Sequence, residues 1–205
     1  MIPARLVLAT GNPGKTAELR ALVAEWGPLD VRALADVGTI APGPETGATY
    51  LENAILKARA VAVASGLPAL ADDSGLEVDA LGGEPGPRSA RWAPSDAERI
   101  AKLLDALRDV PGPRRTARFR CVVALVLPDG GIEAAEGTCS GRIALRPAGT
   151  AGFGYDPVFV ADELGRTLAE AGPAEKQKVS HRARAMRALG ARLRRGNVAC
   201  GPGPC

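Results

Sequence analysis

Two segments of this chain, Phe119–Leu127 and Gly131–Gly141, have the pattern of long strands, and the dipeptide Asp129-Gly130 lies between them. An Asp-Gly pair between two strand-like runs predicts a tight turn that joins them as an antiparallel hairpin. A hairpin of this length is incompatible with a sheet in which every strand is parallel. Because helical and strand-like segments are mixed along the rest of the chain, the sequence predicts an α/β or α+β fold with a mixed sheet and not a purely doubly wound one.

Shorter elements are predicted around this hairpin. Apolar runs predict strands at Arg5–Ala9, Asp30–Leu34 and Leu67–Ala71. Helical periodicity and capping boxes predict helices over Thr16–Trp26, from Thr49 to about Ser65, from Ser95 to about Leu107, and from Ser180 to Arg195. Glycine and proline predict loops at Ala41–Ala48, Gly82–Arg88 and Gly149–Pro157. We expect one domain over residues 1–195 and a disordered tail over residues 196–205.

The segment LATGNPGKT, residues 8–16, is similar to a phosphate-binding loop in which one residue departs from the pattern. Gly14, Lys15 and Thr16 fit, but Ala9 stands where the first glycine belongs. A strand that runs through a turn into a helix brings backbone N–H groups and the positive end of the helix dipole to one point. We therefore predict a phosphate site with Lys15 as a mobile charge and Ala9 as the last strand residue; an ordinary Asn-Pro-Gly turn is the alternative.

Two adjacent carboxylates, Asp72 and Asp73, follow the third predicted strand. At the end of a strand they would face a crevice, where carboxylates suit Mg²⁺ or one of them can act as a general base. A plain Asp-Ser-Gly turn is the structural alternative. Glu52 is fully explained as the third residue of a capping box, so the local sequence favours that role over metal binding.

Aromatic residues make up only 3% of the chain, and two of them stand between glycines in GFGYDP, residues 152–157. Such rings suit stacking on a base, and Asp156 suits a base N–H; the alternative is that one ring packs on the core. Lys176 and the run Ser180-His181-Arg182 place donating side chains near a helix start, where Ser180 can act as the cap. A solvated basic helix is the alternative for this run.

Composition limits the class of protein. The chain is 46% hydrophobic and 24% charged with a net charge of +3, which is typical of a soluble globular protein and too low for wrapping nucleic acid. No apolar run approaches a membrane span of about 18 residues, and we expect neither a signal peptide nor membrane attachment. Four cysteines without a C-x-x-C pair and a single histidine disfavour structural zinc, so reduced thiols in a cytoplasmic protein are expected.

Five blocks together resemble the inosine triphosphate pyrophosphatases, which remove non-standard purine nucleotides. In chain order they are LATGNPGK, ETGATYLENAILKA, ADDSGLEVDALGGEPGPRSARWA, GFGYDPVF and AEKQKVSHR. The resemblance runs from Leu6 to about Leu193, with Arg88 and the cysteine-bearing tail as small departures. It implies an elongated α/β fold with a mixed sheet, flanking helices and two lobes with a nucleotide cleft between them. It also implies a homodimer, Mg²⁺, and hydrolysis of ITP, dITP and XTP to the monophosphate and pyrophosphate, which keeps these nucleotides out of DNA and RNA.

The resemblance implies a role for individual residues as well. Asp73 would be the catalytic proton acceptor and a metal ligand, and Glu52 would be a second carboxylate near the metal. The residues implied to bind substrate are Thr10, Gly11, Asn12, Pro13, Gly14, Lys15, Ser74, Phe153, Gly154, Tyr155, Asp156, Lys176, His181 and Arg182.

These roles predict in-line attack of water on the α-phosphorus, with pyrophosphate leaving. Arg182 only donates hydrogen bonds, so it would favour the O6 acceptor of hypoxanthine or xanthine over the amino group of adenine. Two other classes stay open. A P-loop kinase or NTPase would transfer or release the terminal phosphoryl group, and a non-catalytic RNA- or nucleotide-binding module would show steep salt dependence without turnover.

Overall fold

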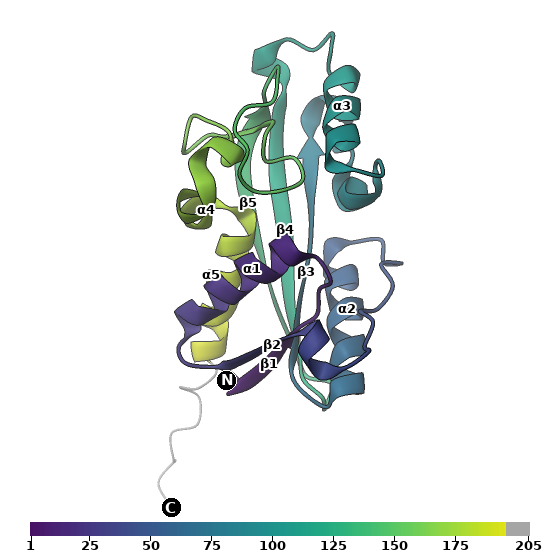
Figure 1. The fold of residues 1–205 in the computed structure, drawn as a ribbon, viewed down its shortest axis with the longest axis vertical. Helices are drawn as coiled ribbons and strands as arrows, with labels where there is room; N and C mark the ends of the chain where they lie inside the picture. Colours follow the sequence, from purple (N-terminus) through teal and green to yellow (C-terminus); the bar gives the residue numbers. More distant parts are fainter. Residues whose placement is uncertain (196–205) are drawn as a thin grey trace, which may run out of the picture. The chain divides into compact units, whose positions relative to one another are not determined.

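The computed structural model describes residues 1–195, which form helices and strands in the α/β arrangement drawn in Figure 1. The strands are β1 (Arg5–Leu8), β2 (Asp30–Ala33), β3 (Ala69–Val78), β4 (Thr116–Val126), β5 (Ile132–Ile143) and β6 (Phe159–Ala161). The α-helices are α1 (Pro13–Val23), α2 (Tyr50–Ser65), α3 (Asp96–Ala106), α4 (Leu168–Val179) and α5 (His181–Arg195). The tail predicted over residues 196–205 lies outside the described part of the chain.

These strands form one sheet in the order β2-β1-β3-β4-β5-β6. β1 is parallel to β2 and to β3, whereas β5 and β6 are antiparallel. The chain turns between β4 and β5 where the Leu127 N–H donates to the Gly131 carbonyl oxygen at 2.8 Å, which is the predicted hairpin. The predicted α/β class, with a mixed sheet and flanking helices, is therefore confirmed.

The described residues divide into two compact units. Unit 1 consists of residues 1–72, 122–136 and 185–195, and unit 2 consists of residues 73–121 and 137–184. In unit 1, Ala58, Val61 and Ala62 of α2 pack in one cluster with Val7 of β1 and Ala69 of β3. Figure 1 shows α2 on one side of the strands of this unit and α1 and α5 on the other. Strands covered on both faces need apolar residues throughout, as in the LVL of β1.

In unit 2, β4 alternates between exposed and buried residues from Thr116 to Phe119, which is typical of a sheet covered on one face. The buried face contributes to a core that includes Leu103 of α3 and Leu168 of α4. On the other face the Arg118 guanidinium donates to Glu77 at 2.7 Å. Helices and loops therefore cover one side of the sheet in this unit.

At two predicted elements the boundaries were wrong in ways that affect the candidate site. The first helix begins at Pro13 and not at Thr16, because Asn12 caps it and proline is well suited to the first helical position. The third strand does not end at Asp72 but continues to Val78, so the stretch DDSG is neither a turn nor a strand end. Its later residues belong to the core of unit 2, which a short apolar run does not reveal.

β6 and α4 were not predicted from the sequence. β6 has only three residues, and α4 contains Gly172 in a non-helical conformation followed by Pro173. Its capping box, formed by Thr167 and Glu170, was a signal that could have revealed the helix. No helix within residues 1–195 is both long and apolar enough to cross a membrane.

Candidate active site

The loop between β1 and α1 is held in shape by its own polar groups. The Asn12 N–H donates to Thr10 Oγ1 at 3.2 Å, and Asn12 Oδ1 accepts from the Lys15 N–H at 3.0 Å. The Thr16 hydroxyl donates to the Asn12 carbonyl oxygen at 3.0 Å. Asn12 therefore caps α1 and fixes the turn that precedes it, which leaves an ordered helix start at the predicted phosphate site.

Ala9 and Lys15 tie this loop to β3. The Ala9 N–H donates to the Leu70 carbonyl oxygen at 2.8 Å, but β1 ends at Leu8, so Ala9 lies one residue beyond the strand and is not its last residue as predicted. The Lys15 ammonium lies 3.1 Å from Asp72 Oδ2, and the Asp72 side chain is fully buried. In this structure the Lys15 ammonium therefore forms an ion pair with a buried carboxylate, which compensates the cost of burying that charge.

Glu52 closes the capping box at the start of α2. Its Oε2 accepts from the Ala48 N–H at 2.7 Å and from the Thr49 N–H at 3.2 Å, while Thr49 Oγ1 accepts from the Glu52 N–H. The capping role is therefore confirmed. One turn later, the buried Lys57 ammonium forms an ion pair with Glu45 at 2.9 Å, a contact that the sequence analysis did not anticipate.

Strand β3 carries three consecutive residues that are candidates for a functional role. Asp72 is the last residue of this stretch of unit 1, and Asp73 and Ser74 are the first residues of unit 2. Asp73 is buried, and Ser74 Oγ lies 3.1 Å from Arg182 Nη2, which donates to it. β3 thus places the partner of Lys15, a buried carboxylate and the partner of Arg182 on consecutive residues.

Phe153 lies beside two cations in unit 2. The Lys176 ammonium is 4.6 Å from the centre of its ring, and the Arg182 guanidinium carbon is 5.8 Å from it. Lys176 also forms a 2.5 Å ion pair with Asp156, and both side chains are more than nine-tenths buried. The structure therefore brings together Phe153, Asp156, Lys176 and Arg182, all of which the sequence singled out.

Asp156 also shapes the loop that carries Phe153. Its Oδ2 accepts from the Phe153 N–H at 3.0 Å. Gly152 has a φ of +80°, and a Cβ at this position would clash with the Asp156 carboxylate, so only glycine fits. We use the name base loop for residues 152–156, after the base that the sequence analysis predicts they bind. Asp156 thus supports the base loop through the Phe153 N–H and pairs with Lys176.

Tyr155 is the ring that packs on the core. It is buried, and its hydroxyl donates to the Ser89 carbonyl oxygen at 3.1 Å. Burial raises the pKa of Tyr155 to about 12. Of the two aromatic residues in the base loop, the half-buried Phe153 is therefore the better candidate for stacking.

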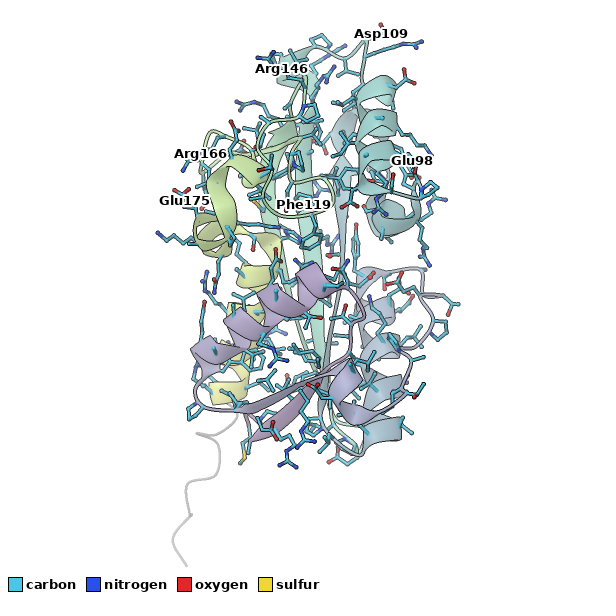
Figure 2. The ribbon with its side chains drawn as sticks, viewed as in Figure 1. Glu98, Asp109, Phe119, Arg146, Arg166 and Glu175 are labelled. Atoms are coloured by element: carbon cyan, nitrogen blue, oxygen red, sulfur yellow. The ribbon has the colours of Figure 1, made fainter. Side chains whose placement is uncertain are left out.

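His181 is held by an aromatic neighbour. Its ring is stacked on Phe119 of β4, with centroids 4.7 Å apart and an angle of 11° between the rings; Figure 2 labels Phe119. Ser180 Oγ accepts from the Ala183 N–H at 3.2 Å, which confirms its predicted role as the cap of α5. No signal in the sequence indicated that the Phe119 ring would stack on His181.

The side chains that could act as metal ligands can be compared with what the predicted Mg²⁺ requires. Within residues 1–195 no group of three or more His, Cys, Asp or Glu side chains is close enough to form a complete metal cage. Mg²⁺ commonly uses one or two protein carboxylates together with substrate phosphates and water. A site with one or two carboxylates and no complete cage is therefore compatible with Mg²⁺ bound together with its nucleotide.

A sequence model of the Ham1 family matches residues 6–192. The chain belongs to the Ham1 family. It is 54% identical over 187 residues to a dITP/XTP pyrophosphatase from Thermus thermophilus, which covers 90% of this chain and 89% of that relative. A dITP/XTP pyrophosphatase from Symbiobacterium thermophilum is 52% identical over 183 residues, covering 89% and 91% of the two chains.

The structure of a HAM1 protein from Coxiella burnetii is similar to this chain, with a TM-score of 0.83, 40% identity and coverage of 94% of this chain and all of that one. These likenesses confirm the family and the enzyme class predicted from the motifs, a nucleoside triphosphate pyrophosphatase.

In this Ham1 chain, several contacts join residues that sequence reasoning never paired. The ion pairs Lys15–Asp72 and Lys176–Asp156, and the bond from Arg182 to Ser74, each connect distant positions. Their residue types were visible in the motifs, but only the fold determines which side chains meet.

Proposed function

We propose that this enzyme hydrolyses non-standard purine nucleoside triphosphates, namely ITP, dITP and XTP, to the monophosphate and pyrophosphate, and so keeps them out of DNA and RNA. The observation that best supports this function is the order of three residues on β3. Asp72 pairs with Lys15, Ser74 accepts from Arg182, and the buried carboxylate of Asp73 stands between them in the sequence. The names of the relatives, dITP/XTP pyrophosphatase, support the same activity.

We assign the triphosphate to residues 10–15. The start of α1 offers backbone N–H groups and the positive end of its dipole, and the Asn12 cap holds this geometry before a ligand arrives. Lys15 adds a positive charge whose partner in the structure is Asp72. A phosphate that approaches Lys15 would share this ammonium, since lysine has three donors.

We assign the base and the sugar to the base loop with its neighbours. The Phe153 ring offers a face for stacking, and Lys176 and Arg182 lie beside that ring. Arg182 is 1% exposed, so its guanidinium has a fixed position. A buried group that only donates favours the O6 acceptor of hypoxanthine or xanthine and disfavours the amino group of adenine. We assign His181, whose ring stacks on Phe119, to the same binding site.

Asp73 is the proposed proton acceptor. Its carboxylate would orient the attacking water and take its proton as the water oxygen adds to the α-phosphorus, while the bond to the pyrophosphate oxygen breaks. Bound Mg²⁺ would supply charge stabilisation for the phosphate oxygens and the leaving pyrophosphate. Asp73 and Glu52 are the residues we propose to hold it.

The test of Asp73 is replacement by asparagine. Asp73→Asn should abolish turnover of dITP and leave measurable nucleotide binding, because the amide cannot accept the proton. The matched control is Asp79→Asn, a carboxylate on the turn after β3 that accepts from Thr116. Near-normal turnover by Asp73→Asn, or an equal loss in Asp79→Asn, would remove Asp73 from the mechanism.

Glu52→Gln separates the two roles of Glu52. Glutamine can still close a capping box, so the stability of α2 should be retained. If Glu52 also holds the metal, the Mg²⁺ concentration at half-maximal rate should rise. An unchanged Mg²⁺ requirement would restrict Glu52 to the cap.

Two further properties follow from the family resemblance and are proposed with it: a homodimer, and a location in the cytoplasm. Sedimentation at micromolar concentration tests the first, and a monomer would contradict it. Fractionation of the source cells tests the second.

A further inference from the structure

One support of the base loop comes from outside the residues assigned to the nucleotide. The Gly154 N–H donates to Asp96 Oδ2 at 2.7 Å. Asp96 is the first residue of α3, and Gly154 directly follows Phe153, the proposed stacking ring. We propose that Asp96 is a positioning residue for base selection, which holds the Phe153 ring in place through Gly154. This inference rests on the proposed function.

The Asp96 carboxylate is itself fixed by its surroundings. Arg99, one helical turn later, donates to Asp96 Oδ1 and also to the Ala90 carbonyl oxygen. The helix start is closed by a capping box, in which Ser95 Oγ accepts from the Glu98 N–H and Glu98 accepts from the Ser95 N–H at 2.9 Å. A carboxylate held in this way offers the Gly154 N–H an acceptor of defined position.

The ionised state of Asp96 strengthens this contact. Burial raises the pKa of Asp96, but the hydrogen bond from Gly154 and the Arg99 guanidinium outweigh burial and hold the pKa below its usual value. A hydrogen bond from a backbone N–H to an ionised carboxylate is stronger than one between neutral groups.

The other supports of the base loop do not replace this one. The Tyr155 hydroxyl donates a hydrogen bond to the Ser89 carbonyl oxygen, and Ser89 Oγ accepts one from the Leu76 N–H of β3 at 2.8 Å. The Phe153 N–H donates a hydrogen bond to the Asp156 carboxylate, which belongs to the same loop. Gly154 depends on Asp96 for its N–H contact, so loss of that carboxylate should loosen the segment that carries the ring and leave the rest of the loop anchored.

The kinetic test uses three variants. Asp96→Ala should raise the KM for dITP about tenfold, with kcat changed less than about twofold, because a charge-assisted hydrogen bond in a positioning contact is lost. Asp96→Asn retains an acceptor for Gly154 and should recover most of the loss. Discrimination between dITP and dATP should narrow in Asp96→Ala. The control, Glu98→Ala, damages the same helix start without touching the loop; Figure 2 labels Glu98.

A normal KM in Asp96→Ala would overturn the inference. An equal rise in Glu98→Ala would also overturn it, since fraying of α3 would then explain the effect.

A second measurement does not need turnover. Amide hydrogen exchange of a peptide covering residues 152–158 in the ligand-free protein should be faster in Asp96→Ala than in the wild type or in Glu98→Ala. If the wild type does not hydrolyse dITP, the proposed function fails, yet this exchange still decides whether Asp96 holds the loop. Unchanged exchange would overturn the inference, and so would faster exchange with normal KM and discrimination.

Discussion

Lys176→Met is the substitution whose consequence the structure determines most sharply. Lys176 and Asp156 form a 2.5 Å ion pair with side chains that are only 6% and 3% exposed. Methionine has a similar length and no charge, so the substitution leaves a buried carboxylate without its ammonium partner. The same carboxylate oxygen accepts from the Phe153 N–H, which links the pair to the base loop.

The expected loss in the free energy of unfolding is about 3–5 kcal/mol, the usual cost of removing one member of a buried ion pair. With a urea dependence of roughly 2 kcal/mol per molar, the midpoint of unfolding should fall by roughly 1.5–2.5 M. In the double variant Lys176→Met/Asp156→Asn, the remaining side chain is neutral, and its amide oxygen can still accept from the Phe153 N–H. The double variant should therefore be more stable than Lys176→Met alone.

Urea unfolding followed by far-ultraviolet circular dichroism measures the stability of the wild type, both single variants and the double variant. Asp156→Asn completes the double-mutant cycle, whose coupling energy should exceed about 1 kcal/mol. A loss below about 1 kcal/mol in Lys176→Met, or additive effects of the two substitutions, would refute the reasoning that this pair is buried and coupled.

Three smaller predictions concern other buried groups. Because burial raises the pKa of Tyr155 to about 12, the stability from its neutral form should be complete below about pH 10 and lost as the pH rises toward 12; ultraviolet titration of the phenol, absent in Tyr155→Phe, checks this. Burial likewise raises the pKa of Cys139 to about 11, so a thiol reagent should label it only on unfolding, in a variant whose two cysteines beyond residue 195 are serine. Gly141→Ala should lower the free energy of unfolding by more than about 1 kcal/mol, because its Cβ would clash with the Val160 carbonyl oxygen; wild-type thermal stability would contradict this.

Local sequence signals predicted much of the fold. The capping boxes at Thr49 and Ser95 and the turn at Asp129-Gly130 each act within a few residues, and the structure confirms all three. Boundaries set by distant partners were missed. β3 continues beyond Asp73 because its later residues join the core of unit 2, which depends on packing with segments far along the chain.

The same distinction holds for the site. The motifs and the family resemblance pointed to Lys15, Phe153 and Arg182 as residue types suited to a nucleotide. They did not indicate that Asp72 would pair with Lys15 or that Ser74 would accept from Arg182. Such contacts require the three-dimensional arrangement, since none of them follows from spacing in the sequence.

In the proposed mechanism, water attacks the α-phosphorus and pyrophosphate leaves. The direct measurement is turnover of dITP with Mg²⁺ in water labelled with heavy oxygen, followed by mass spectrometry of the products. The proposed mechanism predicts dIMP that carries the label and pyrophosphate that does not. Orthophosphate and dIDP would indicate cleavage at the terminal phosphate instead, and labelled pyrophosphate with unlabelled dIMP would place the attack on the β-phosphorus; either result would contradict the account.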